Sequence, residues 1–171
     1  MRALVVYESM FGNTEAVARA VAGGLETRCD EVSLVDVGSA PPIDPGVDLL
    51  VVGGPTHAFS MTRHSTREDA GRQGSPVDPD RPGIREWLAS LSPAPELGVA
   101  TFDTRVAKVR HLPGSAAKSA AKAARRRGLR VVTGAESFYV DDVRGPLLEG
   151  ELDRAGAWGA GLAAILLAPT R

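Results

Sequence analysis

The stretch SMFGNT, residues 9–14, joins a short apolar segment to a predicted helix. The first backbone N–H groups of a helix have no partner within it, and the helix dipole adds partial positive charge at that end. An anion is therefore stabilised there without a basic side chain. Ser9, Asn13 and Thr14 add polar side chains, and Gly12 lets the backbone approach a ligand closely. The stretch predicts a site for a phosphate monoester, with local helix capping by Asn13 or Thr14 as the alternative.

This turn differs from the common nucleotide-binding loops. It contains no lysine and lacks the GK[ST] ending of a nucleoside-triphosphate loop, and it lacks the GxGxxG pattern of a dinucleotide loop. Ser9 is not a candidate nucleophile, because neither a GxSxG motif nor an adjacent base accompanies it.

Two other segments end predicted strands in a similar way. GGPTHAFSM covers residues 53–61, and TFDTR covers residues 101–105. The carboxyl ends of parallel strands meet at one edge of a sheet, so we expect these loops and SMFGNT to converge on one crevice. His57, Phe59 and Phe102 would then bracket a flat ring by stacking.

The elements that hold these loops follow from the hydrophobic pattern. Five short apolar segments are typical of strands buried on both faces of a parallel sheet: 2–7, 31–37, 48–54, 96–102 and 129–140. Helical spacing or composition appears at 14–27, 83–91, 115–127 and 151–167. The connection 38–47 contains three prolines and can form at most one turn of helix. The pattern predicts a single α/β domain over 1–171, a doubly wound sheet of five parallel strands with helices on both faces.

One segment, 56–83, shows no usable period and is rich in charged residues, glycine and proline. We expect it to be a long loop without regular structure. Such loops are uncommon in compact domains and are often functional. Residues 60–82 are therefore predicted to form a lid or a partner-docking loop over the crevice.

Together these motifs resemble the flavodoxin family, and the resemblance covers nearly the whole chain. The tail GPLLEGELDRAGAWGAGLA, residues 145–163, is also similar to flavodoxin-like proteins. Flavodoxins bind FMN at the switch between their first and third strands, so the resemblance implies FMN and the strand order 2-1-3-4-5. The loop match implies that the phosphate is held by Ser9, Met10, Phe11, Gly12, Asn13 and Thr14. It implies ring contacts from Pro55, Thr56, His57, Ala58 and Phe59, and on the other side from Thr101, Phe102, Asp103 and Arg105.

Two departures from the family pattern lie in the first two loops. Phe11 stands where flavodoxins more often have a hydroxyl, in a variant that looks like the FMN modules of flavodiiron proteins. No glycine follows His57 until Gly71, so the peptide flip that flavodoxins use beside flavin N5 falls on Ala58. Ala58 would resist a positive φ, and we therefore expect weak stabilisation of the neutral semiquinone.

A third departure concerns charge near the ring. Residues 56–67 carry His57, Arg63, His64 and Arg67 and no acidic residue. Cations near a flavin raise its reduction potential, so the sequence argues against a simple low-potential carrier.

The resemblance favours an FMN-binding electron-transfer protein. The alternatives are an FMN-dependent NAD(P)H:quinone-type reductase, and a flavodoxin-like module that has lost FMN and serves in protein interaction. Residues 104–130 contain nine basic residues and no acid, which indicates either a solvated helix face or a docking site for an acidic redox partner or a nicotinamide phosphate. The partner, the substrate and the oligomeric state stay open.

Composition excludes several other classes. Formal net charge is −1, from 20 basic and 21 acidic residues, which does not favour nucleic acid. Cys29 is the only cysteine, so no intramolecular disulfide can form. His57, His64 and His111 have no spacing typical of a metal site. The apolar run 160–168 is too short to span a bilayer, and no signal peptide is visible. We expect a cytoplasmic protein that neither enters a membrane nor holds a metal.

Overall fold

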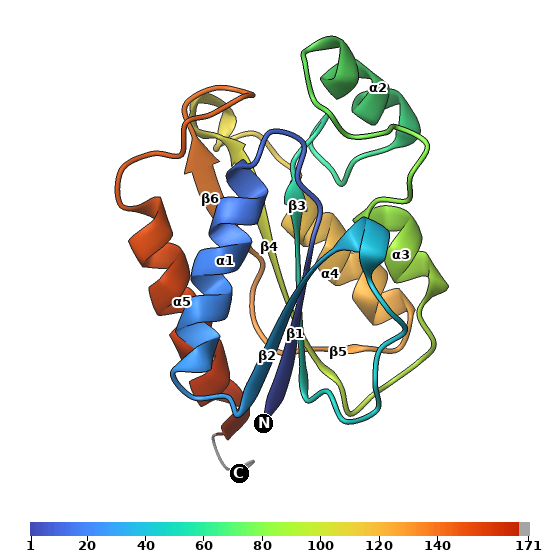
Figure 1. The fold of residues 1–171 in the computed structure, drawn as a ribbon, viewed down its shortest axis with the longest axis vertical. Helices are drawn as coiled ribbons and strands as arrows, with labels where there is room; N and C mark the ends of the chain where they lie inside the picture. The colour runs from blue at the N-terminus through green and yellow to red at the C-terminus, as the bar shows by residue number, and fades with distance from the viewer. Residues whose placement is uncertain (168–171) are drawn as a thin grey trace.

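The computed structural model describes residues 1–167, and these contain one parallel sheet (Figure 1). Its strands are β1 (Arg2–Tyr7), β2 (Glu31–Asp36), β3 (Leu49–Pro55), β4 (Gly98–Val106), β5 (Arg130–Val131) and β6 (Glu136–Val140). The strand order is β2-β1-β3-β4-β5, and β6 also pairs with β4. Every pairing is parallel, so the predicted order 2-1-3-4-5 is confirmed.

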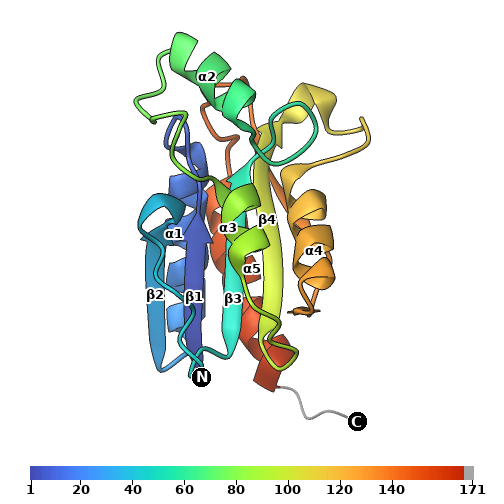
Figure 2. The same ribbon diagram turned by 90° about the vertical axis from the view of Figure 1, so that its right-hand side faces the viewer.

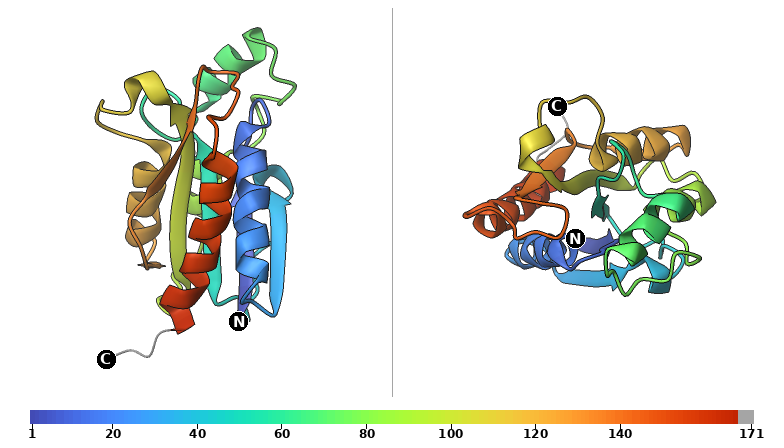
Figure 3. Two further views of the ribbon diagram at one scale, coloured as in Figure 1. Left: turned by 90° about the vertical axis from the view of Figure 1, so that its left-hand side faces the viewer. Right: turned by 90° about the horizontal axis from the view of Figure 1, so that it is seen from above.

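Helices cover both faces of the sheet. α1 (Asn13–Glu26) and α5 (Glu151–Leu167) lie together on one face, and α3 (Ile84–Ser90) and α4 (Ala116–Arg126) lie on the other (Figures 2 and 3). α2 (His64–Arg72) lies beyond the carboxyl ends of the strands, at the top of Figure 1. Two short 3-10 helices, η1 (Val37–Ser39) and η2 (Ala107–Val109), follow β2 and β4.

The predicted apolar face of α1 forms the centre of one core. Val17, Val21 and Leu25 are fully buried between the sheet and α5. Glycines let the two helices approach closely: a Cβ at Gly24 would lie 2.0 Å from the carbonyl oxygen of Gly156. This close packing fixes α1, and with it the turn at its amino end, against the sheet.

The structure corrects two expected elements. The strand expected over 129–140 is divided into β5 and β6. Arg130 pairs with Gly98 and Glu136 pairs with Phe102, so six residue steps on this side of the ladder face only four on β4. The extra residues bulge out of the ladder around a bend at Thr133. The segment 56–83, expected to lack regular structure, contains α2.

The helices give no sign of a membrane segment. None of the helices described within 1–167 is long and apolar enough to cross a bilayer. Of the apolar run 160–168 noted in the sequence, Ala168 lies outside the described residues.

Candidate functional site

The turn before α1 leaves several backbone donors free. Gly12 has a φ of 91°, in the left-handed region that favours glycine, and its carbonyl oxygen accepts the first helical hydrogen bond from Ala16 at 3.0 Å. The Gly12 amide donates to the Ser9 hydroxyl at 3.1 Å. Within residues 1–167 no hydrogen-bond partner is found for the amides of Phe11, Asn13, Thr14 and Glu15. The turn therefore presents a row of donors at a helix amino end, which is what an anion needs.

The polar side chains of this turn hold the turn itself in place. Asn13 Nδ2 donates to the carbonyl oxygen of Arg144 at 3.0 Å, and Thr14 shares a 2.7 Å hydrogen bond with the hydroxyl of Thr104. Both threonines are almost fully buried. The donors left for an anion are thus mainly backbone amides, rather than the side chains of Asn13 and Thr14.

A cavity of about 280 Å³ opens next to the turn, at the carboxyl ends of β3, β4 and β6. This volume is near the lower end of the roughly 300–1,000 Å³ of small-molecule sites. The cavity brings together nine of the predicted site residues: Met10, Phe11, Asn13, Thr14, Pro55, Thr56, His57, Ala58 and Arg105. The convergence of the three loops is therefore seen in the structure.

The second loop turns sharply at Ala58 and Phe59. His57 and Ser60 exchange two backbone hydrogen bonds, of 2.9 and 3.1 Å, and the two residues between them have φ values of 47° and 61°. Both angles lie in the left-handed region, which costs an L-residue roughly 1–2 kcal/mol. Ala58 adopts the positive φ that it was expected to resist, because the paired hydrogen bonds impose a turn that requires it, and the residue is strained there.

Three predicted residues of the third loop do not reach the cavity. Phe102 is fully buried and packs edge-on against Phe138 and Trp158, with ring centroids 6.1 Å away in both cases. The ring lies over Gly53 on β3, where a Cβ would come within 1.9 Å of it. The prediction that Phe102 stacks on a ligand ring is wrong, because Gly53 has no side chain and so leaves room for the Phe102 ring in the core.

Thr101 and Asp103 point toward α4 instead. The Thr101 hydroxyl donates to the carbonyl oxygen of Ala117 at 2.9 Å, and Asp103 Oδ2 accepts from the Ala117 amide at 2.9 Å. Both residues are fully buried beneath the start of α4 and do not line the cavity. Phe59 does not line it either, and its side chain is 48% exposed on the outer side of the turn.

Sequence reasoning missed nearly half of the lining. The missed residues are Thr66, Asp69, Ala70, Gln73, Thr104, Val106, Val140 and Val143. Four of them come from α2 and its end, in the segment predicted as a lid but not recognised as a helix. Thr104 and Val106 lie on either side of the predicted Arg105 at the end of β4. Their place at a strand end was the sequence signal that could have identified them.

A network of buried polar side chains connects α2 to Glu8, the residue that follows β1. The Glu8 carboxylate, directly before Ser9, accepts from the Thr62 hydroxyl at 2.5 Å and from the Ile84 amide at 3.0 Å. Arg67 of α2 is 4% exposed and donates to Thr62 at 3.1 Å. Burial raises the pKa of Glu8, against the effect of these hydrogen bonds. These contacts hold α2 in place, and none of the four residues lines the cavity.

Two of the cations expected beside the ligand have acidic partners instead. Arg67 pairs with Glu86 at 3.4 Å, and His64 pairs with Asp80 at 2.7 Å. Of the four basic residues between 56 and 67, His57 is the one found in the cavity lining, and burial lowers its pKa. The cation that does line the cavity is Arg105.

The basic segment 104–130 divides into buried and exposed members. Arg105 is buried, and half-buried Arg127 donates from Nε to the carbonyl oxygen of Leu91 at 2.8 Å. The other seven are exposed: Lys108, Arg110, Lys118, Lys122, Arg125, Arg126 and Arg130.

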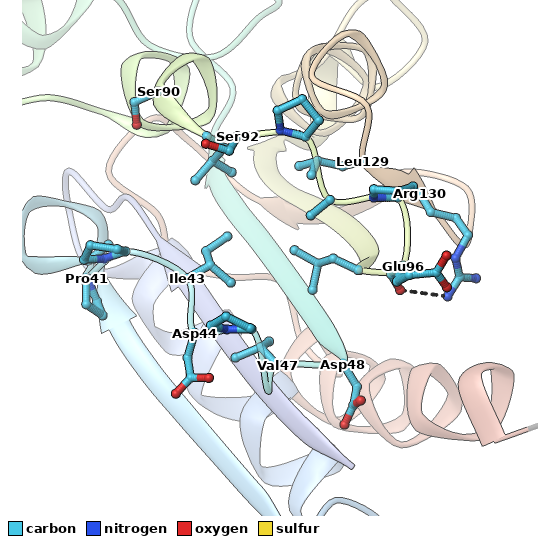
Figure 4. Close-up of a pocket in the computed structure, with 18 of the residues that line it drawn as sticks. Pro41, Ile43, Asp44, Val47, Asp48, Ser90, Ser92, Glu96, Leu129 and Arg130 are labelled. Carbon is cyan, nitrogen blue, oxygen red and sulfur yellow. Dashed lines mark hydrogen bonds between the residues drawn. The ribbon is translucent and has the colours of Figure 1, made fainter.

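A second and larger hollow, of about 1110 Å³, lies at the amino ends of the strands (Figure 4). The proline-rich connection 40–47 forms one wall, and the end of α3, the segment 91–97 and residues 129–130 form the other. Its polar contacts are already internal: Arg130 donates to the carbonyl oxygen of Glu96 at 3.5 Å. Amides without a hydrogen-bond partner within residues 1–167 occur here too, at Ile43, Ser92 and Ala94, but they do not belong to the first turn of a helix.

Comparison with solved structures identifies the fold. A flavodoxin from Archaea matches with a TM-score of 0.70 and 20% sequence identity, over 98% of this chain and 100% of that chain. The chain has the flavodoxin fold. Flavodoxin 1 from Bacillus cereus matches with a TM-score of 0.66 and 17% identity, over 100% of both chains. The flavodiiron core of Flv1 from Synechocystis matches at 0.64 and 15% identity, over 97% of this chain and 36% of that one. No protein-family model and no curated protein matches the sequence.

Proposed function

We propose that the protein binds FMN at the carboxyl end of its sheet and carries electrons on it. The observation that carries the proposal is the row of free amides at Phe11, Asn13, Thr14 and Glu15 beside the cavity. The flavodoxin fold supports it, since the fold places a ligand crevice at this switch between β1 and β3.

The residues present fit FMN. The amides suit a phosphate dianion, and Gly12 leaves its approach open, since no described atom lies within 4 Å of a Cβ built there. The cavity behind them is lined by apolar and planar groups, including Met10, Pro55 and His57. Arg105 brings a buried guanidinium with an unpartnered Nε, which suits a polar heterocycle better than an apolar ligand.

Each group has a task in this proposal. The start of α1 binds the phosphate and so fixes the depth of the ligand. The turn at Ala58 and the end of α2 enclose the ring and exclude water from it, with Gln73 as an available hydrogen-bonding side chain. When bound, FMN supplies the redox chemistry, while the protein orients it and sets its potential. We place the protein in the cytoplasm, working with a redox partner protein.

A second candidate function, NAD(P)H-dependent reduction of a quinone-type substrate, is favoured by one observation. Lys108 and Arg110 are exposed in the segment that directly follows Val106, a residue of the cavity lining. Two cations at this position suit the phosphates of a nicotinamide nucleotide.

The test of both proposals begins with the visible spectrum of the purified protein, with FMN added if it is colourless. Retained FMN with quenched fluorescence supports the binding proposal, and a protein that retains no flavin after FMN addition contradicts it. Anaerobic NADPH added to the holoprotein then separates the candidates. A carrier keeps its flavin oxidised, whereas a reductase bleaches it within seconds to minutes.

A further inference from the structure

Arg105 occupies an unusual position for a cation. It is the next-to-last residue of β4, its exposed fraction is 6%, and it lines the cavity. One end of its guanidinium is tied down, because Nη2 donates to the carbonyl oxygens of Val109 at 2.9 Å and Leu112 at 3.3 Å. These contacts hold the side chain in place, but as neutral carbonyl groups they supply no counter-charge.

The other side of the guanidinium is free. Arg105 Nε is buried and has no hydrogen-bond partner among residues 1–167, and no carboxylate of these residues forms a salt bridge with Arg105. Asp69 lines the same cavity, but it is exposed and paired with Arg72. Asp103, two residues earlier on β4, is a buried acid whose Oδ1 also has no partner in the described part of the chain, but it forms no salt bridge with Arg105 and does not line the cavity. Burying an unpaired charge is costly, so a lone guanidinium held at a cavity wall indicates that an electron-rich or anionic group belongs beside it.

The phosphate of FMN already has donors at the start of α1, so Arg105 is available to the ring. Two electrons and one proton convert the oxidised ring to a hydroquinone that carries one negative charge. In a cavity shielded from water, a fixed cation acts more strongly on that charge than it would in solution.

We propose that Arg105 is the counter-charge for the reduced ring, and that it binds the two-electron-reduced anion more strongly than the neutral oxidised form. This inference rests on the proposed binding of FMN. Arg105 then raises the two-electron reduction potential of bound FMN. A site of this kind favours partners that exchange two electrons at once over one-electron transfer at very low potential.

The test compares Arg105→Gln, Arg105→Lys and a matched control, Arg127→Gln. Arg127 also donates to a backbone carbonyl oxygen, but it lies at the far end of α4 from the cavity. For each protein, titration gives the dissociation constants for oxidised FMN and for riboflavin. Anaerobic reduction with dithionite, which supplies the electrons while water supplies the proton, gives the two-electron midpoint of bound FMN.

We expect Arg105→Gln to weaken binding of reduced FMN by 10- to 100-fold more than binding of oxidised FMN. This factor lowers the midpoint by about 30–60 mV, since a tenfold change is about 30 mV for a two-electron couple. Arg105→Lys keeps the charge and should stay nearer to the wild-type midpoint, and Arg127→Gln should not move it.

Two results would overturn the inference while leaving FMN binding intact: an unchanged midpoint in Arg105→Gln, or a loss of FMN affinity with riboflavin affinity unchanged, which would assign Arg105 to the phosphate. Failure of the wild-type protein to bind FMN would instead remove the proposed function. If Arg105→Gln does not fold, the wild-type holoprotein still decides: reduced FMN should bind at least as tightly as oxidised FMN, and weaker binding of the reduced form rejects the proposal.

Discussion

The two ends of the sheet each carry a hollow, and the hollows differ in chemistry more than in size. The one at the amino ends is about 1110 Å³, and prolines and aliphatic side chains of 40–47 and 91–97 form most of its walls. The one at the carboxyl ends is about 280 Å³, yet it adjoins four free amides and an unpartnered guanidinium. The alignment of donors at a helix amino end, rather than volume, is our reason for proposing the carboxyl end as the ligand site.

The difference follows from how each end is built. At the amino end the chain enters strands from proline-rich connections, and the free amides there, such as those of Ile43 and Ser92, are not aligned in the first turn of a helix. At the carboxyl end β1 leads through a left-handed glycine directly into a helix, which exposes the first-turn amides. A parallel sheet with this connectivity produces the second arrangement only at its carboxyl edge.

The largest effect is expected from Gly12→Val. A β-branched residue is strained at a φ of 91°, so the turn must change shape and the amides lose their common direction. We expect FMN affinity to fall about 100-fold, or about 2.7 kcal/mol, in a fluorescence-quenching titration.

Two control variants sharpen this prediction. Gly23→Ala changes an open glycine on the same helix, and Pro42→Ala changes an exposed residue of the amino-end hollow. Both should keep wild-type affinity. If Pro42→Ala lost as much FMN affinity as Gly12→Val, the proposal that FMN binds at the carboxyl end of the sheet would be wrong.

The hydrogen bond between Thr14 and Thr104 ties the phosphate turn to β4. Both hydroxyls are buried, so Thr14→Val or Thr104→Val leaves its partner unsatisfied and should lower the free energy of unfolding by about 1–3 kcal/mol. The double variant should lose clearly less than the sum of the two single variants, because it removes both polar groups. Urea denaturation measures all three proteins, and strict additivity would show that the two hydroxyls do not interact.

The sheet could be predicted from the sequence because its signals are local and repeated. Runs such as 2–7 and 48–54 are apolar throughout, which strands buried on both faces require. The break between β5 and β6 could not be predicted, since it depends on the register of β4, which lies about thirty residues away. α2 was missed because its sequence, HSTREDAGR, has no apolar stripe, and its order depends on the buried contacts of Arg67.

A smaller effect is expected at the turn of the second loop. Ala58→Gly removes the strain of a positive φ, worth roughly 1–2 kcal/mol, at the cost of about 0.5–1 kcal/mol of backbone entropy in the unfolded chain. The free energy of unfolding should rise by about 0.5–1 kcal/mol. Ala123→Gly, within α4, should instead lower it by about 1 kcal/mol. Destabilisation of similar size in both variants would mean that Ala58 is not strained.

The smallest effect concerns His57, whose pKa is lowered below its ordinary value of 6.5, chiefly by burial. As the pH falls below 6.5, His57 takes up a proton in the unfolded chain before it does so in the folded protein. The free energy of unfolding that is present above pH 6.5 is therefore lost as the pH falls toward the lower pKa of the folded protein. His57→Gln should show a shallower loss between pH 7.5 and 5.5 in urea denaturation. Identical pH profiles for the two proteins would show that His57 is freely hydrated.

The sequence could predict which loops lie at the site, but not which way each of their side chains points. Most residues of the loops at 9–14 and 55–58 line one cavity, as expected of loops that directly follow strand ends. Phe102 and Asp103 were misassigned because Gly53 and the start of α4 decide where those side chains go. Such partners come from other strands and helices, and no local pattern around 101–105 reports them.

The most direct test of the central claim is a paired titration of the flavin-free protein with FMN and with riboflavin, which differ by the phosphate. The account predicts tight binding of FMN and riboflavin binding at least 100-fold weaker, because the amides of Phe11, Asn13, Thr14 and Glu15 would lose their anion. Equal affinity for the two flavins, or no binding of either, would contradict it.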